Sequence, residues 1–432
     1  MRAAEWYTRA GKRAINLGGL SEARELFTQA LSLLPASGYE QRWHALLGRS
    51  EALLQMGEKT ARQDDDQAMK EIADQLGDLT LQAETYSHIA YHAYILGDYS
   101  RAAENYTSAI EFAHRAGDIA KEAVNLSLQV ANLTRQGNLD AAALLVDSAF
   151  ELAKQAGDPN LMMHTLTNLS TYFTMAGDLA RASDLILQQI QINQNQGNLV
   201  GEMYSLTNLG FNYLLLGRYR GGLQMLQRAL EITKTTGARQ VGAYTKLNLA
   251  MAHWRLGDFP AAQRFLEGLF EQLGAMGDEM AQGSERYYEG LVLESTGEWE
   301  AAEDCYQQAR DIFAKLGIEP QRIELQSCLA HLYQQMGEKD ASLRLASETA
   351  GYLLDKGCSG IELPFITFLS CAEAFQAAGD LARMARVVQS GIDELRRRAD
   401  RISDPYWRQV FLDVPPEHQK LAEFYSRRTI EN

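Results

Sequence analysis

Three asparagines at the same position of a recurring pattern are the side chains in this sequence best suited to recognising another molecule. Asn168, Asn208 and Asn248 follow one another at intervals of 40 residues. A carboxamide carries both a donor and an acceptor, so a row of them can bind the N–H and C=O groups of an extended peptide whatever its side chains. The alternative is that each amide bonds to a neighbouring helix and only stabilises packing. We expect peptide binding and keep the packing role as the alternative.

Side chains near these asparagines fit the same interpretation. Tyrosine supplies a large contact area at low entropic cost, and an arginine could bind an acidic ligand residue, although it could equally be a solvated charge at the rim. The predicted peptide-binding set comprises Asn168, Asn208, Asn248, Asn212, Thr167, Thr207, Tyr204, Tyr244, His164, Arg135 and Arg255.

A second constellation has the spacing of metal ligands. Glu84, His88 and His92 are four residues apart, which places them on one face of a helix where they could suit a divalent metal. No fourth ligand lies nearby in sequence and His88 falls at the asparagine position, so we prefer polar groove lining and predict no metal. The acidic run 64–66, close to Arg62, is expected on a solvated face.

The motifs of common catalytic sites do not occur in the chain. It contains no GxxxxGK[ST] phosphate loop, no HExxH zinc motif, no GxSxG nucleophile elbow, and no GxGxxG following a strand. We therefore predict a protein that is not an enzyme and that carries no cofactor.

Two interleaved series of glycines set the positions of all these residues. From Gly57 to Gly337 and from Gly77 to Gly357 the step is 40 residues. A glycine in the left-handed conformation ends a helix at little cost, and the Asp or Asn that often follows can cap the next helix. The spacing predicts pairs of antiparallel helices, A then B. Small residues such as Gly210 recur where helix A must approach helix B closely.

The pattern extends over most of the chain and changes near its end. We expect an all-α solenoid of about ten helix pairs over residues 1–400 and capping helices over 401–432. Within this tail, Trp407, Phe411 and Leu412 fall on one helix face and are expected to cover the exposed end of the last repeat.

The repeats resemble the tetratricopeptide repeat. The third copy carries the pattern as Ala90, Ala93, Gly97, Asp98, Tyr99, Ala102, Tyr106 and Ala109. The 40-residue period is longer than the usual one and is similar to kinesin light chains and to the sensor regions of bacterial signal-transduction ATPases. The resemblance implies a right-handed solenoid with the A helices on its concave side, and asparagines there that hold ligand backbone. The Lys and Arg clamp that the family uses for a free C-terminus cannot be assembled here.

Composition restricts the partners and the compartment. A net charge of −15 and a pI near 5.1 argue against nucleic acid. The four cysteines show no CxxC spacing, which indicates free thiols in a reducing compartment. We find no signal peptide and no apolar run long enough for a membrane span, so we expect a cytoplasmic protein.

Together these features predict a non-catalytic scaffold that binds a protein or peptide in a groove centred on residues 164–255. The tail resembles the R-x-x-F-L-x-x-V-P ending of bacterial multidomain regulators, so we expect the sensor or interaction region of a signalling or transcription regulator. This leaves room for an upstream ATPase or effector domain outside the chain. The alternatives are a peptide-gated regulator of an enzyme, like the quorum-sensing receptors, and a purely structural spacer.

Overall fold

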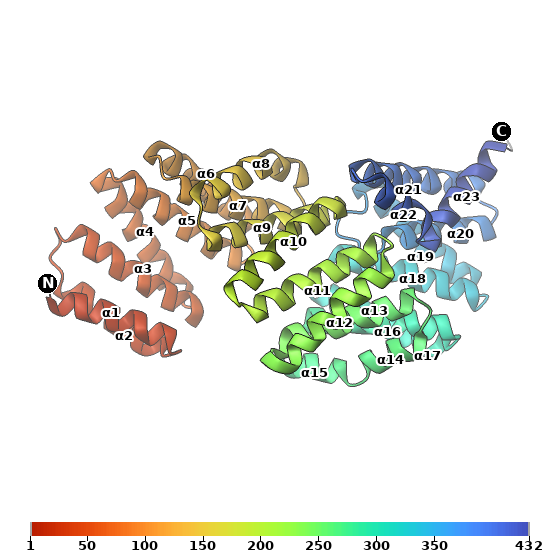
Figure 1. The fold of residues 1–432 in the computed structure, drawn as a ribbon, viewed down its shortest axis with the longest axis horizontal. Helices are drawn as coiled ribbons and strands as arrows, with labels where there is room; N and C mark the ends of the chain where they lie inside the picture. Colours follow the sequence, from red (N-terminus) through yellow and green to blue (C-terminus); the bar gives the residue numbers. More distant parts are fainter. Residues whose placement is uncertain (1, 431–432) are drawn as a thin grey trace. The chain divides into compact units, whose positions relative to one another are not determined.

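Helices are the regular elements of the computed structural model, which describes residues 2–430 (Figure 1). The chain divides into two units, Met1–Leu169 and Ser170–Asn432. The first unit contains α1 (Arg2–Asn16), α2 (Leu20–Leu33), α3 (Tyr39–Met56), α4 (Lys59–Leu76), α5 (Leu79–Ile95), α6 (Tyr99–Ala116), α7 (Ile119–Arg135) and α8 (Leu139–Ala156). Residues of α9 (Pro159–Met175) belong to both units.

The second unit continues the same alternation of A and B helices. It contains α10 (Leu179–Gln196), α11 (Leu199–Leu215), α12 (Tyr219–Thr236), α13 (Arg239–Arg255), α14 (Phe259–Leu266), α15 (Leu269–Ala275), α16 (Glu279–Thr296), α17 (Trp299–Lys315), α18 (Glu319–Gln335), α19 (Lys339–Lys356), α20 (Pro364–Ala377), α21 (Leu381–Arg401), α22 (Pro405–Asp413) and α23 (Pro416–Ile430). Consecutive helices pack on one another within each unit. The predicted all-α solenoid of helix pairs is confirmed.

Helix ends follow the predicted glycine chemistry. Glycines of both series adopt φ between +64° and +84°, and the exception is Gly38, whose φ of −81° starts α3 instead of ending a helix. The acidic caps also form: the carboxylate of Asp78 accepts from the backbone N–H groups of Thr80 and Leu81 at 2.9 and 3.1 Å. These contacts satisfy donors that the first turn of a helix leaves unpaired.

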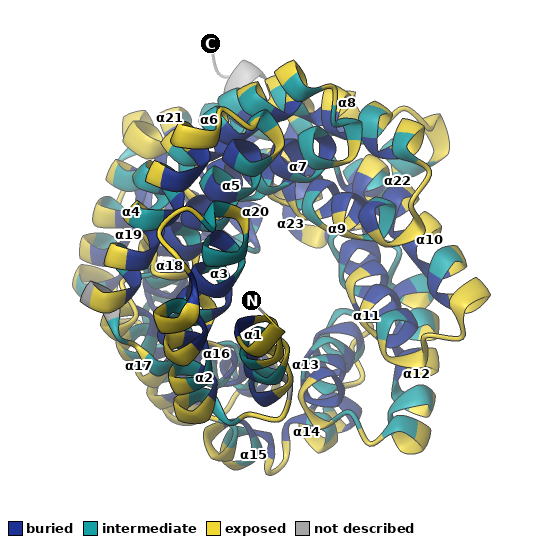
Figure 2. Ribbon diagram, turned by 90° about the vertical axis from the view of Figure 1, so that its left-hand side faces the viewer, coloured by how far each residue is buried: buried dark blue, intermediate teal, exposed yellow. Residues whose placement is uncertain are grey.

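The close approach of helices A and B is visible at Gly210 of α11. A Cβ atom added there would lie 2.5 Å from Cγ of Leu226 on α12, well inside contact distance. Figure 2 shows the consequence, since the helix faces that meet neighbouring helices are buried and the outward faces and turns are exposed. None of the helices among residues 2–430 has the length and apolarity needed to cross a bilayer.

Two stretches depart from the expected regularity. The helix expected between Gly257 and Gly277 is split into α14 and α15, because Gly268 takes φ +68° in its middle. Before α20, a loop at 357–363 explains why the step from Gly337 to the next glycine of its series, Gly379, is longer than 40 residues. Its backbone N–H groups at Glu362 and Leu363 donate to the buried carboxylate of Glu324 at 3.0 and 2.7 Å.

The acidic run 64–66 lies only in part on the predicted solvated face: Asp64 is exposed, but the other two carboxylates are buried, and the prediction is wrong for them. Asp65 and Asp66 are each 2% exposed and Arg62 is 3% exposed. The facing helix α3 supplies their partners: Arg49 donates two hydrogen bonds to Asp65 at 2.6 and 2.8 Å, and Ser50 donates one to Asp66 at 2.7 Å. Sequence alone did not reveal these donors because they lie in the preceding helix.

The tail does more than cover the last repeat. Phe411 is buried against Phe365 of α20, as expected. In addition, the tail returns to the beginning of the second unit, where the Arg218 guanidinium lies 3.3 Å from the ring centroid of Trp407 and Arg401 donates to the carbonyl of Ala176. Helix α22 and the end of α21 therefore contact repeats that are distant in sequence within this unit.

Candidate functional site

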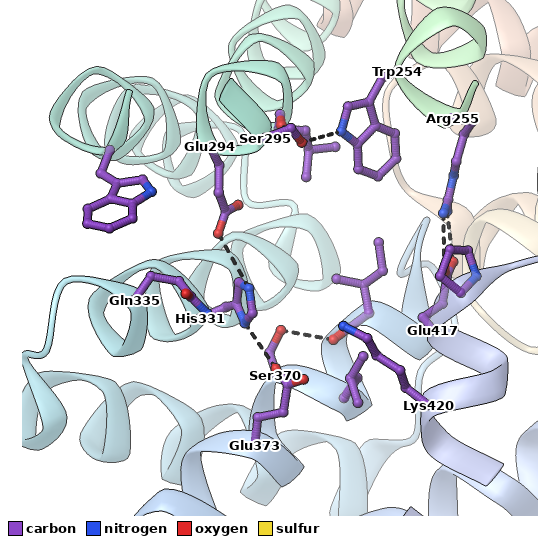
Figure 3. Close-up of a pocket in the computed structure, with 15 residues that line it drawn as sticks. Trp254, Arg255, Glu294, Ser295, His331, Gln335, Ser370, Glu373, Glu417 and Lys420 are labelled. Atoms are coloured by element: carbon purple, nitrogen blue, oxygen red, sulfur yellow. Dashed lines mark hydrogen bonds and ion pairs between the residues drawn. The ribbon is translucent and has the colours of Figure 1, made fainter. Parts of the chain in front are cut away.

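A pocket of about 430 Å³ opens on the A helices of the second unit (Figure 3). Its walls come from α13, α16, α18 and α20 and from Trp299 at the start of α17, and α23 of the tail closes one side. The side chains that give it chemical character are Trp254, Arg255, Glu294, His331, Glu373 and Lys420. Four repeats and the tail thus contribute to a single surface.

The pocket residues stand at fixed distances before the glycine that ends their A helix. His331 and Glu373 lie six residues before this glycine, Trp254 and Glu294 three residues before it, and Arg255 two residues before it. At about 100° per residue, the positions two and six residues before the glycine point within about 60° of the asparagine position, whereas the position three residues before it points about 120° away. Of the pocket residues, only Arg255 belongs to the predicted peptide-binding set, because the other positions do not carry the repeated asparagine from which that set was built.

A charged triad forms the floor of the pocket. His331 Nδ1 lies 3.1 Å from a carboxylate oxygen of Glu373, and its Nε2 lies 3.7 Å from Glu294. Burial opposes the charged imidazole, but the bond to Glu373 and the charge of Glu294 outweigh it and raise the pKa of His331. Burial raises the pKa of Glu294 despite the opposing effect of His331. The floor can therefore exchange protons and hydrogen bonds with a polar ligand.

The wall beside the triad is aromatic and is fixed by the tail. Trp254 donates from Nε1 to Ser295 Oγ at 2.9 Å, and its ring lies under the Arg255 guanidinium at 4.7 Å. Arg255 donates two hydrogen bonds to Glu417 of α23 at 2.8 and 3.0 Å, and both side chains are less than a tenth exposed. Arg255 was predicted to bind an acidic ligand residue, and this position is taken by the chain's own Glu417.

Besides Arg255, four members of the predicted set on α11 and α13 of the second unit are exposed or half-buried. Tyr204 and Asn208 are exposed, whereas Asn248 is half-buried. Tyr244 is also half-buried and donates its hydroxyl to Asp278 at 2.8 Å. Helices α11 and α13 pack beside one another, so these side chains belong to neighbouring A helices of the same unit as the pocket.

Two other members are buried between helices. Thr207 bonds to Thr245 of α13 at 2.8 Å, and Asn212 accepts from Thr174 of α9 at 3.2 Å. Thr207 is 3% exposed and Asn212 is 1% exposed. These contacts stabilise the stacking of A helices and leave no side-chain surface for a ligand, so we omit both residues from the binding surface proposed below.

The remaining members lie in the first unit. His164, Thr167 and Arg135 are exposed. Asn168 is half-buried and donates to Ser127 Oγ of α7 at 3.2 Å, which is the helix-to-helix contact kept above as the alternative. The structure therefore brings Asn208 and Asn248 into one unit and assigns Asn168 to the other.

The histidine pair on α5 has a different third partner from the one expected. One ligand atom each from Asp66, His88 and His92 lie within 4.8 Å of one another. Glu84, the carboxylate considered from sequence spacing, instead pairs with Lys121 at 3.4 Å. Burial and the neighbouring His92 lower the pKa of His88 to about 3, so its ring is neutral.

Comparison with known proteins supports the fold class. Residues 201–268 match the tetratricopeptide repeat family. The structure is similar to the apo form of RapI (TM-score 0.62, 14% identity), to aspartyl phosphate phosphatase F from Bacillus subtilis (0.55, 12%) and to NprR in complex with its cognate peptide NprX (0.52, 11%). Each alignment covers 82% of this chain and 99%, 95% and 98% of the respective structure.

These findings define a class of protein. The chain is an all-α solenoid of helix pairs, part of which matches the tetratricopeptide repeat, and at these identities the solved structures are like it in fold alone. No curated protein sequence matches it significantly.

Proposed function

We propose that the protein is a non-catalytic scaffold that binds an extended peptide or protein segment along the A helices of its second unit. The surface runs from Tyr204 and Asn208 on α11, through Asn248 on α13, to the pocket at His331. The observation that carries the proposal is this pocket, because it includes the end of α13, the helix that carries Asn248, and combines aromatic and charged groups. Such lining is typical of sites that orient a ligand by a few polar contacts.

Each part of the surface has a chemical role in this proposal. The amide of Asn208 binds ligand backbone, since it can donate and accept at once. Trp254 and Trp299 offer ring faces to an apolar or cationic side chain, and Glu294 and Glu373 favour a ligand group that donates hydrogen bonds. The peptide complex of NprR gives a precedent for ligand binding by this fold.

The wider setting is part of the same proposal. We place the chain in the cytoplasm as the sensor or interaction region of a bacterial regulator, with an ATPase or effector domain as its upstream companion. The four cysteines are free and buried, which suits a reducing compartment. The division into a solenoid over 1–400 and a cap over 401–432 is retained as a proposal, as is the contribution of His164, Thr167, Asn168 and Arg135 of the first unit to ligand binding.

Selection from a random library of extended peptides, displayed on phage and panned against the full chain, tests the proposal. The selected peptide should lose at least about tenfold in affinity in the double variant Asn208→Ala/Asn248→Ala, which corresponds to about 1.4 kcal/mol. A second variant, His331→Ala, tests the pocket. Glu231→Ala on helix B α12 is the matched control, because that side chain is exposed and pairs with Lys234 three residues away.

Two results would count against the proposal. One is equal affinity of the selected peptide for the native chain and for both A-helix variants while circular dichroism shows them folded. The other is a photo-crosslinker that captures the peptide from position 231 but not from position 208. A structural spacer would give the first result with every peptide tested.

A further inference from the structure

We propose that the first unit contains a binding site for a divalent transition-metal ion of the Zn²⁺ class, formed by Asp66 of α4 and by His88 and His92 of α5. This site lies in the other unit from the proposed peptide surface, so it stands or fails independently.

The geometry of the three ligands suits one shared ion. One ligand atom from each lies within 4.8 Å of the others, and His92 Nδ1 is 3.6 Å from Asp66 Oδ1. Ligands about 2.0–2.2 Å from a tetrahedral zinc ion lie about 3.3–3.6 Å from each other. The two imidazole rings are already close, with centroids 3.8 Å apart. Small rotations of the side chains would bring all three atoms to bonding distance.

An unpaired buried nitrogen points to the ion independently. His92 is 1% exposed and its Nδ1 has no hydrogen-bond partner among the described residues, because the 3.6 Å separation from Asp66 is too long for a hydrogen bond. Such a buried polar atom is costly unless it is satisfied. A metal bound at Nδ1 would satisfy it, and histidines four residues apart on one helix face are a spacing used by zinc sites.

Other side chains hold the carboxylate in position. Ser50 donates to Asp66 Oδ1 at 2.7 Å, and Arg62 donates to Oδ2 at 3.2 Å. A carboxylate oxygen has two lone pairs, so Oδ1 can accept from Ser50 and still coordinate an ion. Hydrogen bonds of this kind orient metal-binding carboxylates in proteins. The charge of Arg62 opposes a cation and reduces affinity, and neighbouring Asp65 offsets little of that effect because its carboxylate is paired with Arg49.

An ion would reach the site through a pocket of about 680 Å³. Both histidines line this pocket, together with Glu51, Glu84 and Tyr91. Two nitrogens and one carboxylate leave at least one coordination position that faces the pocket, where water or a ligand donor atom could bind. This donor set favours zinc, cobalt or ferrous iron over calcium or magnesium, which prefer oxygen ligands throughout.

Titration of the metal-free full chain with Co²⁺ tests the proposal, because visible d–d absorption reports its coordination. We expect one Co²⁺ per chain, displaced by Zn²⁺, with a band intensity typical of four or five ligands. His88→Gln and His92→Gln should each weaken binding at least about 100-fold, a loss of about 2.7 kcal/mol. His114→Gln is the control, since that histidine is in the same unit and its side chain is 75% exposed.

Thermal unfolding gives a second readout of the same site. Zn²⁺ should raise the melting temperature of the native chain and of His114→Gln, and should leave that of His88→Gln unchanged. His88 is only half-buried, so this variant remains informative even if His92→Gln fails to fold. The proposal is overturned if the native chain shows no Co²⁺ band, or if native chain and His88→Gln bind Co²⁺ with equal affinity.

Discussion

The ion pair between Arg255 and Glu417 should control whether the tail stays closed over the pocket. The two side chains are 7% and 8% exposed, and they share two hydrogen bonds at 2.8 and 3.0 Å. In Glu417→Gln the guanidinium remains buried without a counter-charge as long as the tail is docked. Opening of the tail would return that charge to water, so the variant favours the open state.

The size of the effect follows from the burial. Removing one partner of a buried ion pair costs about 3–5 kcal/mol, because the other charge is left uncompensated. At about 1.4 kcal/mol per factor of ten, the equilibrium for tail opening should shift by about a hundredfold to a few thousandfold. The same change at a solvent-exposed pair should cost at most about 1 kcal/mol.

Hydrogen exchange of backbone amides is the appropriate assay because it measures local opening. Amides of α22 and α23 should exchange about a hundredfold or more faster in Glu417→Gln than in the native chain, while α16 and α17 should change little. The control is Glu231→Gln, whose pair with Lys234 is 68% and 64% exposed. If protection of α22 and α23 falls by less than tenfold, or falls equally in the control, the tail is not held by this ion pair.

Three other changes test separate parts of the structure. Burial lowers the pKa of His418 to about 4, although Glu417 opposes this and Arg255 and Arg398 add to it. A depressed pKa gives stability that is complete above the unfolded pKa of about 6.5 and is lost as pH falls toward about 4. Hydrogen-exchange protection of the tail, corrected for intrinsic exchange, should therefore decline between pH 7 and 5. The variant His418→Gln should flatten this decline. Gly210→Ala forces a Cβ against the neighbouring helix and should lower the free energy of unfolding, measured by thermal unfolding, by about 1–3 kcal/mol. Gly351→Ala places a Cβ in open space within a helix and should raise it by about 0.5–1 kcal/mol. Equal effects of the two variants would refute the close crossing. The four cysteine thiols are buried, so Ellman's reagent should label less than one per native chain and all four in denaturant, and rapid native labelling would contradict this.

The sequence was sufficient to predict the helix pairs because their boundaries depend on local chemistry. Left-handed glycines such as Gly97 and caps such as Asp98 act on residues within one turn of the chain, and the structure has both. The break at Gly268 was missed because it lies outside both glycine series. Spacing alone could not show whether Gly268 breaks the helix in the left-handed conformation or lies within a regular helix.

Site prediction was less complete. The repeat position of the asparagines predicted a helix face on which Asn208 is exposed, but the same reasoning could not separate exposed amides from those used for stacking. Thr207 and Asn212 bond to side chains 38 residues away, in neighbouring helices. Whether a polar group faces a ligand or a neighbouring helix depends on the rotation and spacing of adjacent repeats, which no single repeat encodes.

The sequence by itself determined that this protein is a stack of antiparallel helices, since each turn is specified by glycines and caps acting on their immediate neighbours. Only the tertiary structure decided where the functional groups meet. Arg255 and Glu417 are 162 residues apart in sequence, and Asp66 reaches the histidines of α5 from the preceding helix. The cause in both cases is the packing of one helix on another, because it fixes distances that the spacing of residues along the chain leaves free.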